Sequence, residues 1–464
     1  MERFDVLVIG SGSGMIVAST AVDNGFKTAI VDSGPMGGTC INRGCVPSKM
    51  LIYPIDAVSI LKEAQRLGVN ATVNSIDFKN IMTRTHNLVN GDSATQARAV
   101  KNTPELTWFN ETGEFISDYT MQVGEHTINA ELIFIVSGAR PGIPPIKGIE
   151  NVDYLTSDAV LELETPPKSI IIIGGGYVGA EYGHFFSGIG TKTTIIQRAS
   201  RILPDEEPEI SDLLKRELEQ RMEIYTDFEV GSAKQEGAVK TVIARNRVDG
   251  SLKEFSAEAL MIAAGRVPNS DILKPEKTGV KLDERGYVMV NEYLETSKKN
   301  IWAFGDAIGK KMFRHAANHE AELVWHNAVH GKKSRLNYLT VPHAVFSWPE
   351  IASVGLGEAE AVKLIGKQEV LVGKAMYTDV ARGEAMREVE GFVKAIVHRK
   401  TGKVLGYHII GPHASILIQE VVNAMAADGN LWSIAKGLHI HPALPEVVLK
   451  AFGRLQPVQV RSKH

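Results

Sequence analysis

One pattern occurs twice in this chain and constrains its fold more than any other feature. Residues 5–9 form a short apolar run that leads into a glycine-rich turn, a helical stretch and a second apolar run ending at Asp32. Apolar runs without polar alternation are typical of strands buried on both faces. The same order of elements returns in residues 169–196, where four consecutive isoleucines precede the turn. The repeat predicts an α/β protein with two parallel, Rossmann-like units.

The first turn carries the glycines of a dinucleotide-binding unit. Gly10, Gly12 and Gly14 would let the backbone approach a pyrophosphate, and the start of the following helix would attract its charge. Asp32, at the end of the second strand, suits a ribose hydroxyl. The third glycine position of the usual pattern holds Met15, so we expect helix and strand to pack differently there.

The second turn has a complete GxGxxG pattern, and the strand after it ends without an acid. Its glycines are Gly174, Gly176 and Gly179. Gln197 stands where an acid would select an unphosphorylated ribose, and Arg198 and Arg201 are close by. This favours a 2′-phosphate, and therefore NADPH, over the alternative that both arginines are only solvated surface residues. Two nucleotide-binding units imply two cofactors, or a cofactor and a nucleotide cosubstrate.

The only two cysteines, Cys40 and Cys45, are separated by four residues. A disulfide that closes so short a loop removes little chain entropy. A regular helix would separate their Cα atoms by about 7.5 Å, whereas disulfides need about 4.4–6.8 Å, so the segment must bend. Pro47 fits the first turn of a helix, whose start would favour a thiolate. The alternatives are inert thiols or half of a zinc site, but no second cysteine pair completes such a site. We therefore predict a redox-active pair.

Composition places limits on the partners of the chain. A net charge of −3 offers no attraction to nucleic acid or to an acidic membrane surface. The chain enters a strand at its first residues without a signal-peptide pattern, and glycines interrupt its longest apolar runs. We expect a cytoplasmic protein that binds neither nucleic acid nor membrane, in which a purely structural disulfide would be unusual.

The length of 464 residues predicts several domains. Residues 52–110 have mostly helical character, residues 114–135 have strand character, and a proline-rich linker follows. The expected parts are a first nucleotide-binding domain (1–150), a second (151–270), a central part that returns to the first (271–338) and an α+β unit (339–464).

His441 is the strongest acid–base candidate among the histidines. It precedes a proline-started helix that carries Glu446, so the two could form an oriented imidazole–carboxylate pair, although a lone histidine is more often structural. His315 and His319 have helical spacing, but the order HxxxHE excludes a zincin motif, and no metal site is expected.

Taken together, these motifs resemble the flavoprotein (pyridine nucleotide) disulfide reductases over nearly the whole chain. The resemblance implies that the α+β unit is a dimerisation domain and that the chain binds FAD and a nicotinamide nucleotide. The FAD residues by similarity are Gly10, Gly12, Gly14, Asp32, Gly38, Thr39, Gly138 and Asp306. Those for the nicotinamide nucleotide are Gly174, Gly176, Gly179, Arg198, Arg201 and Gly265. Lys49 and Glu181 would pair beside the flavin, and Tyr177 would cover it.

The resemblance also implies a relay of electrons. The nucleotide would reduce FAD, and FAD would reduce the Cys40–Cys45 disulfide. Cys40 would then attack the substrate disulfide while Cys45 stays against the flavin. His441, oriented by Glu446, would protonate the departing thiol at the site of the other subunit of a homodimer.

Three functions remain open. Residues 313–321 and 441–448, together with Arg198, look most like mycothione reductase, an NADPH-dependent reductase of a low-molecular-weight disulfide. The loop around Cys40 differs little from that of dihydrolipoamide dehydrogenase, which uses NAD and works with lipoyl-carrying complexes. A flavoprotein with only a structural role is the third possibility, against which the retained cysteines, His441 and Glu446 argue.

Overall fold

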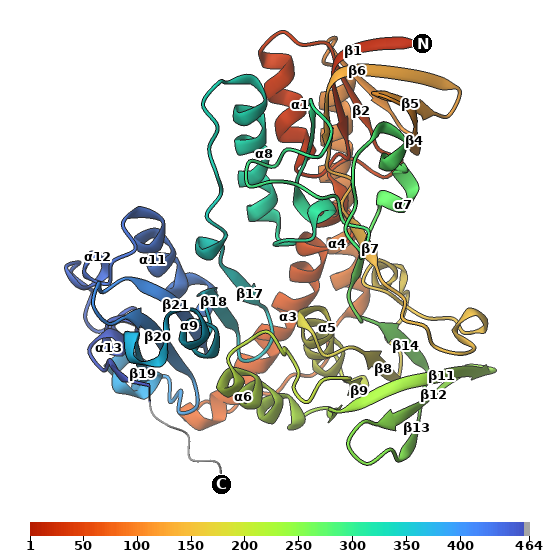
Figure 1. The fold of residues 1–464 in the computed structure, drawn as a ribbon. Helices are drawn as coiled ribbons and strands as arrows, with labels where there is room; N and C mark the ends of the chain where they lie inside the picture. The colour runs from red at the N-terminus through yellow and green to blue at the C-terminus, as the bar shows by residue number, and fades with distance from the viewer. Residues whose placement is uncertain (459–464) are drawn as a thin grey trace.

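Two parallel βαβ units and a six-stranded antiparallel sheet form the framework of the molecule (Figure 1). The computed structural model describes residues 1–458, and the structural statements below concern these residues. The first unit lies at the top of Figure 1, the second at the bottom, and the C-terminal unit beside them. The α/β class predicted from the sequence is confirmed.

The first sheet has seven strands in the order β3-β2-β1-β6-β5-β4, and β16 also pairs with β6. Strands β3, β2, β1, β6 and β16 are parallel, whereas β4, β5 and β6 form an antiparallel meander. The bounds are β1 (Glu2–Ile9), β2 (Thr28–Val31), β3 (Leu106–Phe109), β4 (Gly113–Ser117), β5 (Thr120–Val123), β6 (His126–Ile135) and β16 (Ile301–Ala303). The expectation of helix up to residue 110 was wrong at β3, because Phe109 is buried beside β2 and supplies a sheet strand.

Gly14 explains how helix α1 (Gly14–Asp23) packs without a glycine at position 15. A Cβ atom on Gly14 would lie 2.6 Å from Val136 Cγ1 and 2.7 Å from Val8 Cγ1. The close approach of helix to sheet therefore occurs at Gly14, and the partly buried Met15 packs against the edge of the core.

The second unit has a four-stranded parallel sheet in the order β10-β9-β8-β14. Its elements are β8 (Ser169–Ile173), α5 (Tyr177–Gly188), β9 (Lys192–Ile196), α6 (Pro208–Glu219), β10 (Glu223–Tyr225) and β14 (Ala259–Ile262). A separate antiparallel sheet consists of β11 (Phe228–Glu236), β12 (Val239–Asn246) and β13 (Leu252–Ala257). The antiparallel pair β7 (Ala139–Pro141) and β15 (Arg266–Pro268) joins the segments that connect the two units.

The C-terminal unit is a six-stranded sheet in the order β17-β18-β21-β20-β19-β22 with helices around it. Its strands are β17 (His343–Val345), β18 (Ile351–Gly355), β19 (Val370–Met376), β20 (Phe392–His398), β21 (Val404–Ile410) and β22 (Gln456–Pro457). Its helices are α9 (Glu358–Ile365), α10 (Ala381–Ala385), α11 (Ala414–Ala427), α12 (Trp432–Ala435) and α13 (Glu446–Phe452).

Helices α3 (Cys45–Glu63) and α5 cross at very short range. A Cβ atom on Gly188 of α5 would lie 2.0 Å from Ile55 Cγ2 of α3, so only glycine fits there. The helical segment Gly38–Leu67, which is interrupted at Arg43 and Gly44, is long and apolar enough to cross a membrane by length and composition alone. In this fold it is a packed helix, because Leu51 and Ile55 are fully buried against α5 and α4 (Phe78–Lys101).

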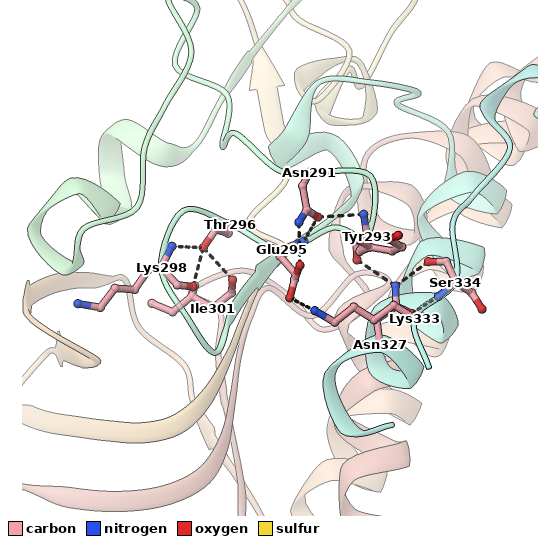
Figure 2. Close-up of polar contacts among 9 residues, drawn as sticks. All are labelled: Asn291, Tyr293, Glu295, Thr296, Lys298, Ile301, Asn327, Lys333 and Ser334. Carbon is pink, nitrogen blue, oxygen red and sulfur yellow. Dashed lines mark hydrogen bonds and ion pairs between the residues drawn. The ribbon is translucent and has the colours of Figure 1, made fainter. Parts of the chain in front are cut away.

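A polar network shapes the loop that leads into β16 (Figure 2). Asn291 accepts backbone hydrogen bonds from Tyr293 and Glu295, and the Asn327 amide donates to the Tyr293 carbonyl over 3.0 Å. Lys333 pairs with Glu295, and Asn327 also exchanges hydrogen bonds with Ser334. These contacts tie the loop to helix α8 (Arg314–Val329) and so hold β16, which ends just before Gly305 and Asp306.

The remaining elements are short. They are the α-helices α2 (Gly38–Asn42) and α7 (Ser270–Leu273) and the 3₁₀ turns η1 (Ala64–Leu67), η2 (Ile149–Asn151), η3 (Ala159–Glu162), η4 (Pro275–Thr278), η5 (Gly305–Ile308), η6 (Tyr338–Thr340), η7 (Lys367–Glu369) and η8 (Tyr377–Asp379).

Candidate functional site

The two cysteines lie on different helices. Cys40 is in α2, Cys45 opens α3, and the helical geometry breaks at Arg43 and Gly44 between them. The predicted bend is therefore present. Both cysteines are free thiols in this structure, Cys40 partly buried and Cys45 exposed. The break lets the second thiol donate a hydrogen bond to the first sulfur.

This contact makes the two thiols one titrating unit. The hydrogen bond from Cys45 lowers the pKa of Cys40 to about 7, against the effect of burial, and the charges of Arg314 and Lys49 lower it further. The pKa of Cys45 is raised, because its thiol donates that hydrogen bond, is partly desolvated although the residue is exposed, and lies beside the Cys40 charge. The pair therefore loses one proton near neutral pH and retains the other.

A cavity of about 400 Å³ lies at the carboxyl ends of the parallel strands of the first sheet. It is lined by Gly10, Gly12, Asp32, Gly38, Thr39, Cys40, Ser137, Gly138, Asp306 and Arg314. The cavity thus joins the first glycine turn, the strand ends and the reactive thiol, at the edge where α/β sheets bind ligands. A Cβ atom on Gly38 would lie 2.7 Å from Gly12 Cα, so the thiol-bearing loop touches the turn directly.

Asp32 and Asp306 reach this cavity from different strand ends. Asp32 accepts backbone hydrogen bonds from Ser11 and Gly34 over 2.6 and 2.9 Å. These bonds orient its carboxylate at the cavity wall. Burial raises the pKa of Asp306, and Arg266, 3.6 Å away, opposes this shift.

The lining of this cavity suits a ligand with phosphate and ribose groups, such as FAD. Gly10 has a φ of +114°, and a Cβ there would lie 2.3 Å from the Val136 carbonyl oxygen, so only glycine fits at this turn. The Ser137 hydroxyl is buried and has no hydrogen-bond partner within residues 1–458. A bound ligand would satisfy it.

A second cavity of about 860 Å³ lies beside the second glycine turn. Gly174, Gly176, Tyr177, Arg198 and Gly265 line it. Gly179 does not line it but permits the turn, because a Cβ there would lie 2.0 Å from the Gly174 carbonyl oxygen. The size and position suit a nicotinamide nucleotide.

Gln197, which stands at the end of β9 in place of the acid of the usual pattern, has a structural role. Its buried side chain accepts a hydrogen bond from Gly175 N over 3.1 Å and donates one to the Arg201 carbonyl over 3.2 Å. Arg198 lines the cavity with a side chain that is 72% exposed, 3.6 Å from Glu229. The Arg201 guanidinium instead binds Asp212 over 2.7 Å and lines neither cavity, so the two arginines differ in position.

Lys49 and Glu181 join the helix after Cys45 to the helix after the second turn. The Lys49 ammonium lies 2.9 and 2.8 Å from the two Glu181 carboxylate oxygens, and the Phe346 backbone donates to the same carboxylate. Glu181 is buried. The predicted pair is therefore present, and Tyr177 stands one helical turn before Glu181 at the cavity wall.

His441 and Glu446 form a pair that lies outside both cavities. His441 Nδ1 is 2.9 Å from Glu446 Oε1, and Ala443 N donates to Glu446 Oε2 over 3.0 Å. These hydrogen bonds lower the pKa of Glu446. The His441 side chain is 73% exposed, so this chain alone leaves the dyad facing outward.

Sequence reasoning missed several residues at the cavities. Ser11 links Asp32 to Gly37, Arg314 adds a cation beside Cys40, and Phe313 lines both cavities. Arg314 lies at the start of a helix, within the segment 313–321 discussed above. Only this position could have drawn attention to it. His343 also lines the second cavity, and no pattern in the neighbouring sequence predicts this.

Comparison with known proteins gives a consistent result. The family model described as pyridine nucleotide-disulphide oxidoreductase matches residues 4–328, and that of the family's dimerisation domain matches residues 341–452. Mycothione reductase of Mycobacterium tuberculosis (strain H37Rv) is 34% identical over 97% of this chain and 99% of its own length. Dihydrolipoyl dehydrogenase of Synechocystis is 32% identical over 97% of this chain and 98% of its own length. Among solved structures, the chain is similar to the Cu(II) complex of the HOCl-induced flavoprotein disulfide reductase RclA from Escherichia coli. The TM-score is 0.86 at 27% identity, and the match covers 98% of this chain and 99% of that chain.

Proposed function

Because this chain belongs to the pyridine nucleotide-disulphide oxidoreductase family, and is thus an enzyme that acts on sulfur groups, we propose that it is an NADPH-dependent reductase of a small disulfide. The low-molecular-weight substrate would be reduced in the manner of mycothione reductase, which the chain matches over its whole length. We also propose a cytoplasmic location.

Bound FAD would supply the two-electron link between the nicotinamide nucleotide and the cysteine pair. The chain's own thiols carry the rest of the reaction. The Cys40 thiolate attacks one sulfur of the substrate disulfide, forms a mixed disulfide and releases the first thiolate, which takes a proton. Cys45 then gives up its proton and attacks the Cys40 sulfur, which closes the Cys40–Cys45 disulfide, and the second thiolate that is released takes up a proton.

The proton donor in this proposal is His441 of the partner subunit. Three observations support it: the His441 side chain is exposed, the dyad lies outside both cavities of its own chain, and the matching segment is the family's dimerisation domain. Apolar side chains flank it, since Leu438 and Ile440 are 102% and 78% exposed. Such a surface is suited to burial in a homodimer.

One observation carries the preference for NADPH. The side chain at the end of β9 is Gln197, which is turned inward, and the next residue, Arg198, lines the cavity where a ribose phosphate would lie. Arg247 lies nearby and shares Glu229 with Arg198, so two cations face one carboxylate. The Arg198 guanidinium at the cavity wall favours the doubly charged 2′-phosphate.

Arg198→Ala should lower kcat/KM for NADPH by about 10- to 100-fold and leave that for NADH nearly unchanged, since a charge-assisted bond to phosphate is lost. Steady-state kinetics with both nucleotides measure this. Arg201→Ala is the matched control, because Arg201 is bound to Asp212 and should show no such selectivity. Faster reduction by NADH that survives Arg198→Ala would contradict the NADPH assignment.

Dihydrolipoamide dehydrogenase is the second candidate, favoured by the 32% identity over the whole chain. It would reduce NAD with dihydrolipoamide and would bind a lipoyl-carrying complex. A stopped-flow comparison of NADH and NADPH, followed by a panel of small disulfides and dihydrolipoamide, separates the two. Turnover of dihydrolipoamide with NAD, without reduction of any small disulfide, would replace our proposal by this one.

A further inference from the structure

One aromatic ring separates the two cavities. Phe313 and its neighbour Met312 line both of them. The Phe313 ring lies 6.5 Å from the ring of Tyr177 at the wall of the nucleotide cavity. In the proposed function electrons pass between these cavities, so the orientation of Phe313 affects how closely the two cofactors approach.

Two imidazoles hold the Phe313 ring in a parallel stack. The ring centroids of His315 and His343 each lie 5.6 Å from that of Phe313, with interplanar angles of 6° and 4°. His315 Nε2 is 2.8 Å from the carbonyl oxygen of Pro342, the residue before His343. The three rings therefore form one stack that links α8 to β17.

A buried carboxylate fixes His343. Glu206 Oε1 lies 2.5 Å from His343 Nε2, and the Ser353 hydroxyl donates to Glu206 Oε2 over 2.6 Å. Ser353 is the partner of His343 in the β17–β18 register. Burial would raise the pKa of Glu206, but these hydrogen bonds lower it overall, so the carboxylate is ionised with both oxygens occupied.

The loop that carries Glu206 is locked to the C-terminal sheet. The buried Lys394 ammonium of β20 lies 2.5 Å from Glu207, 3.1 Å from Glu209 and 2.7 Å from Glu358. Lys374 of β19 binds Glu209 from the other side over 2.7 Å. The nucleotide unit, the C-terminal sheet and the segment before α8 are thus joined at the stack.

We propose that Glu206 and His343 are positioning residues for hydride transfer between bound nicotinamide nucleotide and flavin. The pair holds Phe313 as a rigid wall that sets the approach of the nicotinamide ring beside Tyr177. The transfer oxidises the dihydronicotinamide and reduces the flavin by two electrons, and neither residue gains or loses an atom. The inference rests on the proposed function only in requiring a nicotinamide nucleotide as reductant. It does not depend on which disulfide the enzyme reduces.

The test uses the FAD-loaded enzyme and the variants His343→Ala, His343→Phe and Glu206→Gln. Stopped-flow bleaching with NADPH and with its 4-deuterated form gives the hydride rate and its isotope effect. For His343→Ala we expect a roughly tenfold slower rate and a larger isotope effect, because the rings are less well aligned. His343→Phe should recover part of the rate, since it restores the stack. Equilibrium binding of NADP⁺ should weaken in Glu206→Gln and His343→Ala.

Lys400→Met is the matched control, because it breaks the Lys400–Glu369 ion pair of the same C-terminal unit, which does not involve the Glu206 loop, and should leave rate, isotope effect and binding unchanged. Parental values in Glu206→Gln and His343→Ala, or equal losses in Lys400→Met, would overturn the inference. If His343→Ala does not fold, the other two variants carry the test. Loss of disulfide turnover alone would refute only the proposed substrate, whereas an unbleached parent enzyme would overturn both proposals.

Discussion

At the scale of single residues, the reactivity of the cysteine pair depends on a cation from a distant part of the chain. Arg314 is one of the charges that lower the pKa of Cys40 to about 7. Arg314→Gln should raise this pKa, so that less thiolate is present at pH 7 and alkylation of the reduced enzyme requires a higher pH. The pH dependence of the rate of iodoacetamide labelling measures the shift.

Two controls belong to this prediction. Arg314→Lys keeps the charge and should keep the alkylation midpoint near pH 7. Arg43→Gln alters another arginine of the same cavity, one that pairs with Asp158 instead, and should leave the midpoint in place. An unchanged midpoint in Arg314→Gln would show that Arg314 does not lower the pKa of Cys40.

At the scale of elements, helix α1 lies against the first sheet through Gly14. A methyl group there would overlap Val8 and Val136, so Gly14→Ala should destabilise the first unit by about 1–3 kcal/mol and weaken retention of FAD. The measurement is the temperature at which FAD is released on heating, followed by the rise in flavin fluorescence. Met15→Ala is the matched control and should change the release temperature little, because Met15 is only partly buried. A larger effect at Met15 would refute the packing role of Gly14.

At the scale of the whole molecule, we predict that the active site needs two chains. Cys40→Ser and His441→Gln should each inactivate the homodimer, because one lacks the attacking thiol and the other the proton donor. Mixing the two variants by co-expression should recover about a quarter of the parental activity, since random pairing makes half of the dimers mixed, each with one intact site. Turnover per chain measures this. No recovery in verified mixed dimers would mean that His441 does not serve the partner's site.

Much of the fold could be predicted from short-range patterns. The glycine turns after apolar strands identify both βαβ units, because only glycine allows the backbone geometry and the close contacts that Gly10 and Gly174 show. The break between Cys40 and Cys45 follows from helix geometry once the two cysteines are assumed to form a disulfide. The strand at Leu106–Phe109 was missed, since its apolar residues acquire strand structure only by pairing with β2.

The sequence by itself determined the residue types that can do redox and nucleotide chemistry, because their spacing is local and their backbone requirements are strict. The tertiary structure decided which of them meet. It separated Arg198 from Arg201, placed Arg314 beside Cys40, and stacked His343 on Phe313, contacts that join residues far apart in the chain. It also turned His441 outward, away from the cavities of its own chain. Such contacts depend on how sheets and helices pack over long sequence separations, which no local pattern of residues encodes.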